Sequence, residues 1–355
     1  MTLTFLDFFA GIGGFRRGME LAGHKCVGHC EWDKYANESY KAIHNVKEDE
    51  WFGKDIREVR ANELPKADVW CFGFPCQDIS VAGKQLGFKG QRSSLFFTVT
   101  RLIRDTKEEN RPKYLFIENV KNLLSVNGGT DFLKLLIELD EIGYDAEWQI
   151  LNSKDFGVPQ NRERVFIIGH LRGECGSKVF PISRSNKQTI KKIMGKSQGN
   201  SIYSVDGLSV CLGANGGGQG AKTGLYAINV SRKDKPQDTD TANCLMARDY
   251  KGIGNQKMLA DAVLTPNRLE KRQNGRRFKE VGEPMFTLTA QDRHGVMIND
   301  CKIRRLTPKE CFRLQGWRDE DFEKVSSLCS DTQLYKQAGN GVTVNVIYEI
   351  AKKLN

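Results

Sequence analysis

The sequence has no long apolar run, no export leader and no CxxC cysteine pair. No stretch approaches the about 20 consecutive apolar residues that span a bilayer, and residues Met1 to Phe9 lack a basic leader with a cleavable apolar segment. We therefore expect a cytoplasmic protein that is neither exported nor inserted into a membrane. The ten cysteines form no CxxC pair, which argues against a zinc site, and they would stay reduced.

The excess of positive over negative charge is confined to one part of the chain. The length of 355 residues suggests two domains, and the formal net charge is +10. Residues 181–330 hold 26 Lys and Arg against 16 Asp and Glu, whereas the remainder is balanced at 28 against 28. A neutral body with a basic lobe is typical of a polyanion binder, because phosphate neutralisation supplies most sequence-independent affinity.

A strand, a glycine-rich turn and a helix open the chain. Residues 3–9 read as the strand, and Ala10, Gly11, Gly13 and Gly14 belong to the turn before a helix through Leu21. Such a turn lets the backbone approach a ligand. The third glycine of GxGxxG is absent, which disfavours a pyrophosphate ligand and a nicotinamide oxidoreductase.

The next strand points to a nucleoside ligand. It spans Cys26 to Cys30 and ends at Glu31, about 20 residues beyond the turn, where such folds place a carboxylate for ribose hydroxyls. Phe9 and Trp32 are candidates to pack on an adenine, and Asp55 with Ile56 to read its exocyclic amine.

Cys76 follows a buried strand, Val69 to Phe74. Pro75 ends the hydrogen-bonding ladder, so Cys76 sits at a strand's carboxyl end, where ligands collect in open parallel sheets. A buried structural thiol is the common role of a free cysteine, and only the neighbours favour a nucleophile. A further buried strand from Tyr114 to Ile117 ends in Glu118, a second polar group at a strand end.

Alternating strands and helices predict a doubly wound α/β sheet as the fold. Helices are expected at residues 93–105 and 130–143, and two strands at 146–151 and 164–169 close the sheet. We predict a catalytic and cofactor-binding domain of residues 1–180 and 331–355, and a mostly β or irregular target-recognition domain of residues 181–330. The apolar helix from Val344 to Leu354 would pack on the N-terminal sheet, after a glycine-rich turn at residues 337–342.

The basic lobe holds three similar segments, each followed by a glycine-bearing loop and an apolar run. The segments are Val210 to Ala214, Asn243 to Ala247 and Phe286 to Ala290, and the runs are Leu225 to Ile228, Leu259 to Leu264 and Val296 to Ile298. Repeated hairpins and chance similarity both explain the pattern. Further on, Thr307, Pro308 and Glu310 predict a capped helix start.

Together these motifs resemble, in order, those of the bacterial and phage DNA (cytosine-5)-methyltransferases. The matching segments are Asp7 to Gly14 (cofactor loop), Gly73 to Ser80 (Pro-Cys nucleophile loop), Glu118 to Val120 (cytosine-binding motif), Gln160 to Arg164 (basic motif), Arg305 to Gly316, and Gln337 to Val342. The resemblance implies the fold of S-adenosylmethionine-dependent methyltransferases and S-adenosylmethionine as cofactor. It adds Pro75, Leu95, Asn340 and Val342 to the cofactor side, with Asn340 beside Pro75; Gly341 departs from the serine of many relatives.

The expected reaction begins with attack of the Cys76 thiolate on carbon 6 of cytosine, because carbon 5 alone is a poor nucleophile. Glu118, held protonated by burial, would donate to ring nitrogen 3. The resemblance assigns Arg164 to steadying the base and Arg162 to supporting Glu118. The thiolate leaves after methyl transfer and loss of the carbon 5 proton.

The target base must be extruded from the duplex into the site. A glycine- and lysine-rich loop, Ser80 to Gln91, is expected to close over DNA. The predicted DNA contacts are Gln77, Ser80, Lys84, Thr287 and Leu288. Residues 210–228 resemble a recognition loop but have Cys211 in place of threonine, and reading of more than one DNA sequence is a hypothesis.

Double-stranded DNA is the expected partner of a monomer, with a cognate restriction endonuclease as a further partner that forms no stable complex. Two alternatives remain at this point: a tRNA cytosine-5 methyltransferase on the same scaffold, and a catalytically silent DNA-binding regulator.

Overall fold

The computed structural model describes most of the first 174 residues, residues 306–354, and short segments between these two parts. The described residues are 1–74, 95–174, 177–183, 190, 192–194, 201–204, 208–212, 225–229, 260–264, 294–298, 301–304 and 306–354. Among them, no helix has the length and apolar character needed to cross a membrane.

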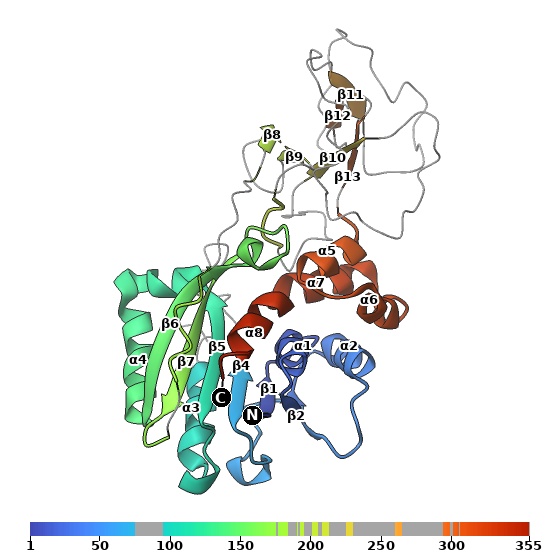
Figure 1. The fold of residues 1–355 in the computed structure, drawn as a ribbon. Helices are drawn as coiled ribbons and strands as arrows, with labels where there is room; N and C mark the ends of the chain where they lie inside the picture. The colour runs from blue at the N-terminus through green and yellow to red at the C-terminus, as the bar shows by residue number, and fades with distance from the viewer. Residues whose placement is uncertain are drawn as a thin grey trace.

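A seven-stranded sheet forms the body, with helices on both faces (Figure 1). Its strands in spatial order are β3 (Trp51–Gly53), β2 (Lys25–Cys30), β1 (Thr4–Phe8), β4 (Val69–Phe72), β5 (Tyr114–Val120), β7 (Glu163–Leu171) and β6 (Tyr144–Asn152). The first five run parallel, and β7 is antiparallel to both β5 and β6. The predicted doubly wound sheet is confirmed.

The order of the strands brings the chain after β1 and the chain after β4 to the same edge of the sheet. The chain leaves β1, builds β2 and β3 on one side, and returns to β4 on the other, so the order reverses between β1 and β4. Ligands of open α/β sheets bind outside the carboxyl ends of the strands at such a reversal. The glycine-rich turn after β1 and residues 73–74 after β4 therefore lie at the edge of the sheet where a site is expected.

Alternation of side chains along the strands produces two cores. Leu6 and Phe8 face one side, where they pack with α3 (Leu95–Asp105) and α4 (Thr130–Glu141). Phe5 faces the other side, where it packs with α1 (Gly14–Leu21) and α8 (Val344–Ala351). Successive strand residues point to opposite faces, so a five-residue strand serves both layers.

The last helix packs on the N-terminal sheet, as predicted, and it lies beside the first helix. A β-carbon at Gly18 would lie 2.6 Å from Cβ of Ile347, which shows how closely α1 and α8 approach. Figure 1 shows the two chain ends close together beneath this helix pair. The C-terminal segment is thus part of the N-terminal body.

The remaining helices join the body to the region after residue 180. They are α2 (Lys34–His44), α5 (Pro308–Leu314), α6 (Asp319–Ser326) and α7 (Asp331–Asn340). Thr307 and Glu310 cap α5 reciprocally and Pro308 occupies its first turn, which confirms the predicted start. The glycine-rich turn predicted at 337–342 is wrong in part, because Gln337 to Asn340 complete α7. Burial of Leu334 and Ala338 in an apolar cluster outweighs the low helix propensity of glycine there.

A second sheet of six strands occupies the basic lobe (Figure 1). Its strands in spatial order are β11 (Ala260–Leu264), β12 (His294–Ile298), β13 (Cys301–Arg304), β10 (Leu225–Asn229), β9 (Ile202–Ser204) and β8 (Lys192–Met194). The three apolar runs of the internal similarity coincide with β10, β11 and β12. The segments that precede β11 and β12, and with them the hairpin hypothesis, lie outside the described residues.

Candidate active site

An ion pair between Glu118 and Arg164 lies at the carboxyl end of the parallel strands. Arg164 is opposite Val120 in the β5–β7 ladder, which puts it on the same sheet face as Glu118. Arg164 Nε lies 3.1 Å from Oε1 of Glu118. Burial raises the pKa of Glu118 above its ordinary range, and the charges of Arg164 and Arg162 oppose that rise. The site therefore holds an acid near two cations.

The strand that leads to Cys76 touches the same carboxyl group. A β-carbon at Gly73 would stand 3.1 Å from Oε2 of Glu118, so glycine leaves the room that this side chain occupies. On the opposite face of β5, Asn119 Nδ2 donates to the carbonyl of Phe74 at 3.3 Å. β4 and β5 thus fix the chain up to the residue that precedes Pro75. Cys76 itself lies outside the described residues.

Arg162 lies deeper than Arg164 and holds backbone from two distant segments. Its side chain is only 3% exposed. Nη2 donates to the carbonyls of Gly341 at 2.8 Å and Gly339 at 3.2 Å, and Nη1 donates to the carbonyl of Leu212 at 3.2 Å. Among the described residues it donates to no carboxylate, so its relation to Glu118 is one of charge.

The glycine-rich turn is held by the carboxylate that follows β2. Glu31 accepts the backbone N–H of Gly11 through Oε2 and that of Asp33 through Oε1, each at 2.7 Å. Gly11 and Gly13 have φ of +58° and +85°, a region that favours glycine. A β-carbon at Gly13 would stand 2.1 Å from His44, whereas one at Gly11 would meet nothing within 4 Å. The turn is packed at Gly13 and open at Gly11.

Aromatic and acidic side chains follow β2 and β3, the two strands on the same side of β1. Trp32 is 66% exposed, and the Arg57 guanidinium lies 4.9 Å from its ring centroid. Arg57 also holds Asp55, with Nε 2.9 Å from Oδ1. Ile56 is buried in the core of the sheet. Phe9 has a φ of +52° at the start of the turn, and Ala10 donates its N–H to the carbonyl of Cys30.

The remaining predicted site residues divide into two groups. Gly14 touches Val342, since a β-carbon there would lie 2.7 Å from Cγ2 of that valine. Leu95 packs at the edge of the α3 core, and Asn340 is exposed at the end of α7. Outside the described residues lie Pro75, Cys76, Gln77, Ser80, Lys84, Thr287 and Leu288.

Sequence reasoning did not find the buried polar network behind the arginines. Gln160 donates to the carbonyl of Leu314 and accepts the N–H of Leu212, and Gln315 donates to the carbonyl of Ala338. Thr343 donates to Oε1 of Gln315 at 2.8 Å. These partners are far apart in sequence, so no local pattern could have indicated them. Cys211, noted only as a departure, lies beside both arginines.

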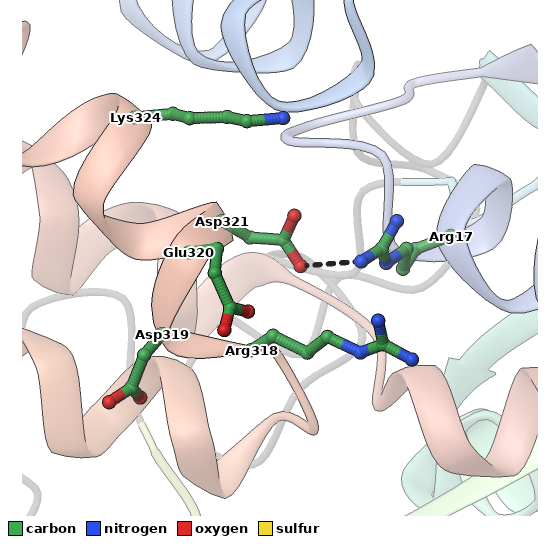
Figure 2. A pocket seen from close by; sticks show the side chains of 6 residues that line it. All are labelled: Arg17, Arg318, Asp319, Glu320, Asp321 and Lys324. Carbon is green, nitrogen blue, oxygen red and sulfur yellow. Dashed lines mark ion pairs between the residues drawn. The ribbon is translucent and has the colours of Figure 1, made fainter.

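A separate charged hollow lies between α1 and α6 (Figure 2). Arg17 of α1 points toward Asp321 of α6, and their Nη2 and Oδ2 atoms are 3.0 Å apart. The rest of the lining comes from Arg318, Asp319, Glu320 and Lys324. It contains none of the predicted site residues. Within the described part of the chain, no group of three His, Cys, Asp or Glu side chains is arranged to hold a metal ion.

Comparisons with known proteins agree over the whole chain. The family model described as C-5 cytosine-specific DNA methylase matches residues 3–355. Orphan methyltransferase M.SPRI of Bacillus phage SPR is 35% identical, with 99% of this chain and 97% of that protein covered. Type II methyltransferase M.HhaI of Haemophilus parahaemolyticus is 30% identical, with 99% and 95% covered. The solved structure of Entamoeba histolytica methyltransferase EhMeth aligns with a TM-score of 0.62 at 18% identity, covering 99% and 98%, and supports the fold.

Proposed function

This chain belongs to the C-5 cytosine-specific DNA methylase family, and from that premise we propose Cys76 as its nucleophile, Glu118 as its acid and S-adenosylmethionine as its methyl donor. The chain is a DNA cytosine-5 methyltransferase. Addition of a cysteine to a flipped cytosine is the general chemistry of the family. The assignment of each role to a residue of this chain is the proposal.

One observation carries the proposal: Glu118, with a raised pKa, contacts the last strand before Cys76 through Gly73. When the Cys76 thiolate adds to carbon 6, the electrons of the 5,6 double bond move toward carbon 5 and the ring. Glu118 donates its proton to nitrogen 3 and so neutralises the charge that develops there. Carbon 5 then takes up the methyl group and forms the new carbon–carbon bond. Its proton is lost to solvent, the carbon–sulfur bond breaks and Cys76 leaves as thiolate, while nitrogen 3 returns its proton to Glu118. Arg164 orients the carboxyl group through its 3.1 Å ion pair.

The turn after β1 fits an adenosine-type methyl donor. Glu31 uses two acceptor positions for Gly11 and Asp33, and a carboxylate has about four, so two stay available for ribose hydroxyls. The space beside Gly11 suits a sugar. The exposed ring of Trp32 suits stacking on a base. When bound, S-adenosylmethionine supplies an electrophilic methyl group. Asp55 and Ile56 would contact the adenine edge.

We also propose that different parts of the chain carry catalysis and DNA recognition. Residues 1–180 and 331–355 carry catalysis and the cofactor, and residues 181–330 read DNA. The described segment 208–212 supports a close connection between the two, because Asn161 donates to the carbonyl of Ser209 at 2.9 Å. Gln77, Ser80, Lys84, Thr287 and Leu288 are the proposed DNA contacts.

We also propose a cytoplasmic monomer that acts without a stable protein partner. The relatives include orphan phage methyltransferases and type II methyltransferases. A cognate endonuclease that cuts the same sequence would therefore meet this enzyme only through DNA.

The decisive experiment combines mapping with one substitution. The parent chain and Cys76→Ser are expressed separately in a host without cytosine methylation, and genomic DNA is sequenced after bisulfite treatment. We expect methylated cytosines in a defined sequence with the parent chain and none with Cys76→Ser. Cys329→Ser, at a half-buried cysteine between α6 and α7, is the control and should methylate as the parent does. Full methylation by Cys76→Ser would refute the nucleophile assignment.

A further inference from the structure

A buried cation that has no carboxylate partner among the described residues lies near the proposed acid. Arg162 is 3% exposed, and its described acceptors are three backbone carbonyls and the sulfur of Cys211. Its Nε has no hydrogen-bond partner among the described residues. Burial of a charge is costly unless an opposite charge compensates it. Among those acceptors, only the Cys211 sulfur can become an anion.

Cys211 contacts both arginines of the site. Its Sγ lies 3.4 Å from Nη1 of Arg162 and 3.9 Å from Nη2 of Arg164. Burial alone would favour the neutral thiol, but the two guanidinium charges outweigh it and lower the pKa of Cys211 below the ordinary value. The sulfur comes from the segment 208–212, whereas the arginines belong to the hairpin of β6 and β7. The contact therefore joins the basic lobe to the catalytic body.

Arg164 is shared between two acidic groups. Its Nε faces Oε1 of Glu118 at 3.1 Å while its Nη2 faces the Cys211 sulfur. Within the described part of the chain, four ionisable groups thus form one cluster of two cations and two acids, and it is largely enclosed. An anion at Cys211 reduces the positive field that Glu118 experiences, and a neutral group there leaves that field uncompensated.

We propose that Cys211 is a positioning residue for methyl transfer: its thiolate, held by Arg162 and Arg164, balances their charge so that Glu118 keeps its proton for the target base. This inference rests on the proposed role of Glu118 as the acid. It gives the basic lobe a direct part in setting the catalytic acid, besides any part in reading DNA. Among the described residues, Arg162 and Arg164 are charged groups that face Cys211, with Glu118 beyond Arg164.

The direction of the pH effect follows from the charges. Methyl transfer needs protonated Glu118, so activity falls as pH rises through the pKa of that group. A thiolate at position 211 strengthens proton binding by Glu118. Loss of the thiolate therefore lowers the pH at which activity falls. A permanent anion at position 211 should bring that pH back to the value of the parent enzyme.

The first measurement determines the protonation state of the Cys211 thiol and does not depend on activity. Thiolate absorbance in the ultraviolet is followed against pH for the parent and for Cys211→Ser, and their difference isolates one thiol among ten. The folded protein should show a titration midpoint below that of the same difference in denaturant. A midpoint at or above the denatured value would overturn the inference, whatever the role of Glu118.

The second measurement tests the effect on chemistry. Values of kcat and KM are determined across pH for the parent, Cys211→Ser and Cys211→Asp, with Cys329→Ser as control. We expect the alkaline limb of kcat to move to lower pH in Cys211→Ser and to return in Cys211→Asp, while KM for DNA stays within about twofold. A purely structural residue would lower kcat at every pH without moving the limb, and that result would also overturn the inference.

The two proposals fail separately. If Glu118→Gln methylates DNA at the parent rate, the proposed acid is wrong, yet the absorbance difference still reports the state of Cys211. If the limb moves in Cys211→Ser and Glu118→Gln has no alkaline limb, both proposals stand.

Discussion

Gly73 and Glu118 face one another across neighbouring strands, and a β-carbon on Gly73 would approach Oε2 of Glu118 to 3.1 Å. The approach couples the end of β4, which leads to Cys76, to the carboxyl group on β5. A residue larger than glycine at position 73 would have to move the Glu118 carboxyl group. The backbone that delivers the proposed nucleophile and the side chain that supplies the proposed acid are thus positioned together.

Substitution Gly73→Ala should therefore reduce catalysis more than binding. The new methyl group displaces the Glu118 carboxyl by a few tenths of an ångström, and errors of this kind at a reacting centre cost about 10-fold or more in rate. We expect kcat to fall while KM for DNA changes little. Steady-state kinetics test this, with thermal unfolding as the control for folding. An unchanged kcat would show that catalysis does not depend on the position that this contact gives to the Glu118 carboxyl group.

Substitution Glu118→Gln should lower kcat by about 10² to 10⁴-fold, because an amide keeps the shape but supplies no transferable proton. Burial raises the pKa of Glu118, so the parent enzyme should stay active well above the pH at which an ordinary carboxyl ionises. Its rate should fall as pH rises further. Rates across pH test this, and the variant's residual rate should lack that fall. A matching fall in Glu118→Gln would assign it to another group.

Substitution Arg162→Lys should destabilise the site as a whole. A lysine cannot reach the carbonyls of Leu212, Gly339 and Gly341 together, and unpaired buried acceptors cost about 1–3 kcal/mol each. We expect unfolding in urea to shift by about 3 kcal/mol, with a parallel loss of methyl transfer. Lys121→Arg, at an exposed ion pair with Glu163, is the control and should leave both unchanged. A stable, inactive Arg162→Lys would instead indicate a purely catalytic role.

Substitution Glu31→Gln should weaken cofactor binding. One N–H acceptor becomes an N–H donor, which faces either Gly11 or Asp33 and disturbs the turn. Loss of a charge-assisted hydrogen bond costs about 1.5–3 kcal/mol, a factor of about 10 to 100 in Kd. Calorimetric titration with S-adenosylhomocysteine measures this without turnover. Glu48→Gln, an exposed site, removes the same charge and should bind as the parent does.

Substitution Gly18→Ala should destabilise the protein by about 1–3 kcal/mol, because its methyl group overlaps Ile347 where α1 and α8 meet. Ile347→Ala alone leaves a cavity and should cost about 2–5 kcal/mol. The double variant should cost less than the sum of the two, since each relieves the other. Urea unfolding of the four proteins measures the coupling. Strict additivity would show that the two helices separate before the transition.

Short apolar runs that alternate with helix-forming segments were enough to predict the body of the fold. Buried runs such as Val69 to Phe72 specify strands, and the turn after β1 requires glycine at positions with positive φ. These are local requirements, so they are visible in the sequence. The prediction of a turn at 337–342 was wrong in part because a tertiary contact, not a local requirement, decides the structure there. Packing of Leu334 and Ala338 keeps Gly339 helical.

The sequence by itself determined the order of the motifs, the residue types at the strand ends and the family of the protein. Only the tertiary structure decided which of these groups touch. Arg162 and Gly341 are 179 residues apart and meet at 2.8 Å, and Cys211 reaches arginines that lie 47 and 49 residues before it. Contacts at such separations depend on how whole layers pack, which no local pattern encodes. The chemistry of the site follows from residue identity, and its charge balance follows from the fold.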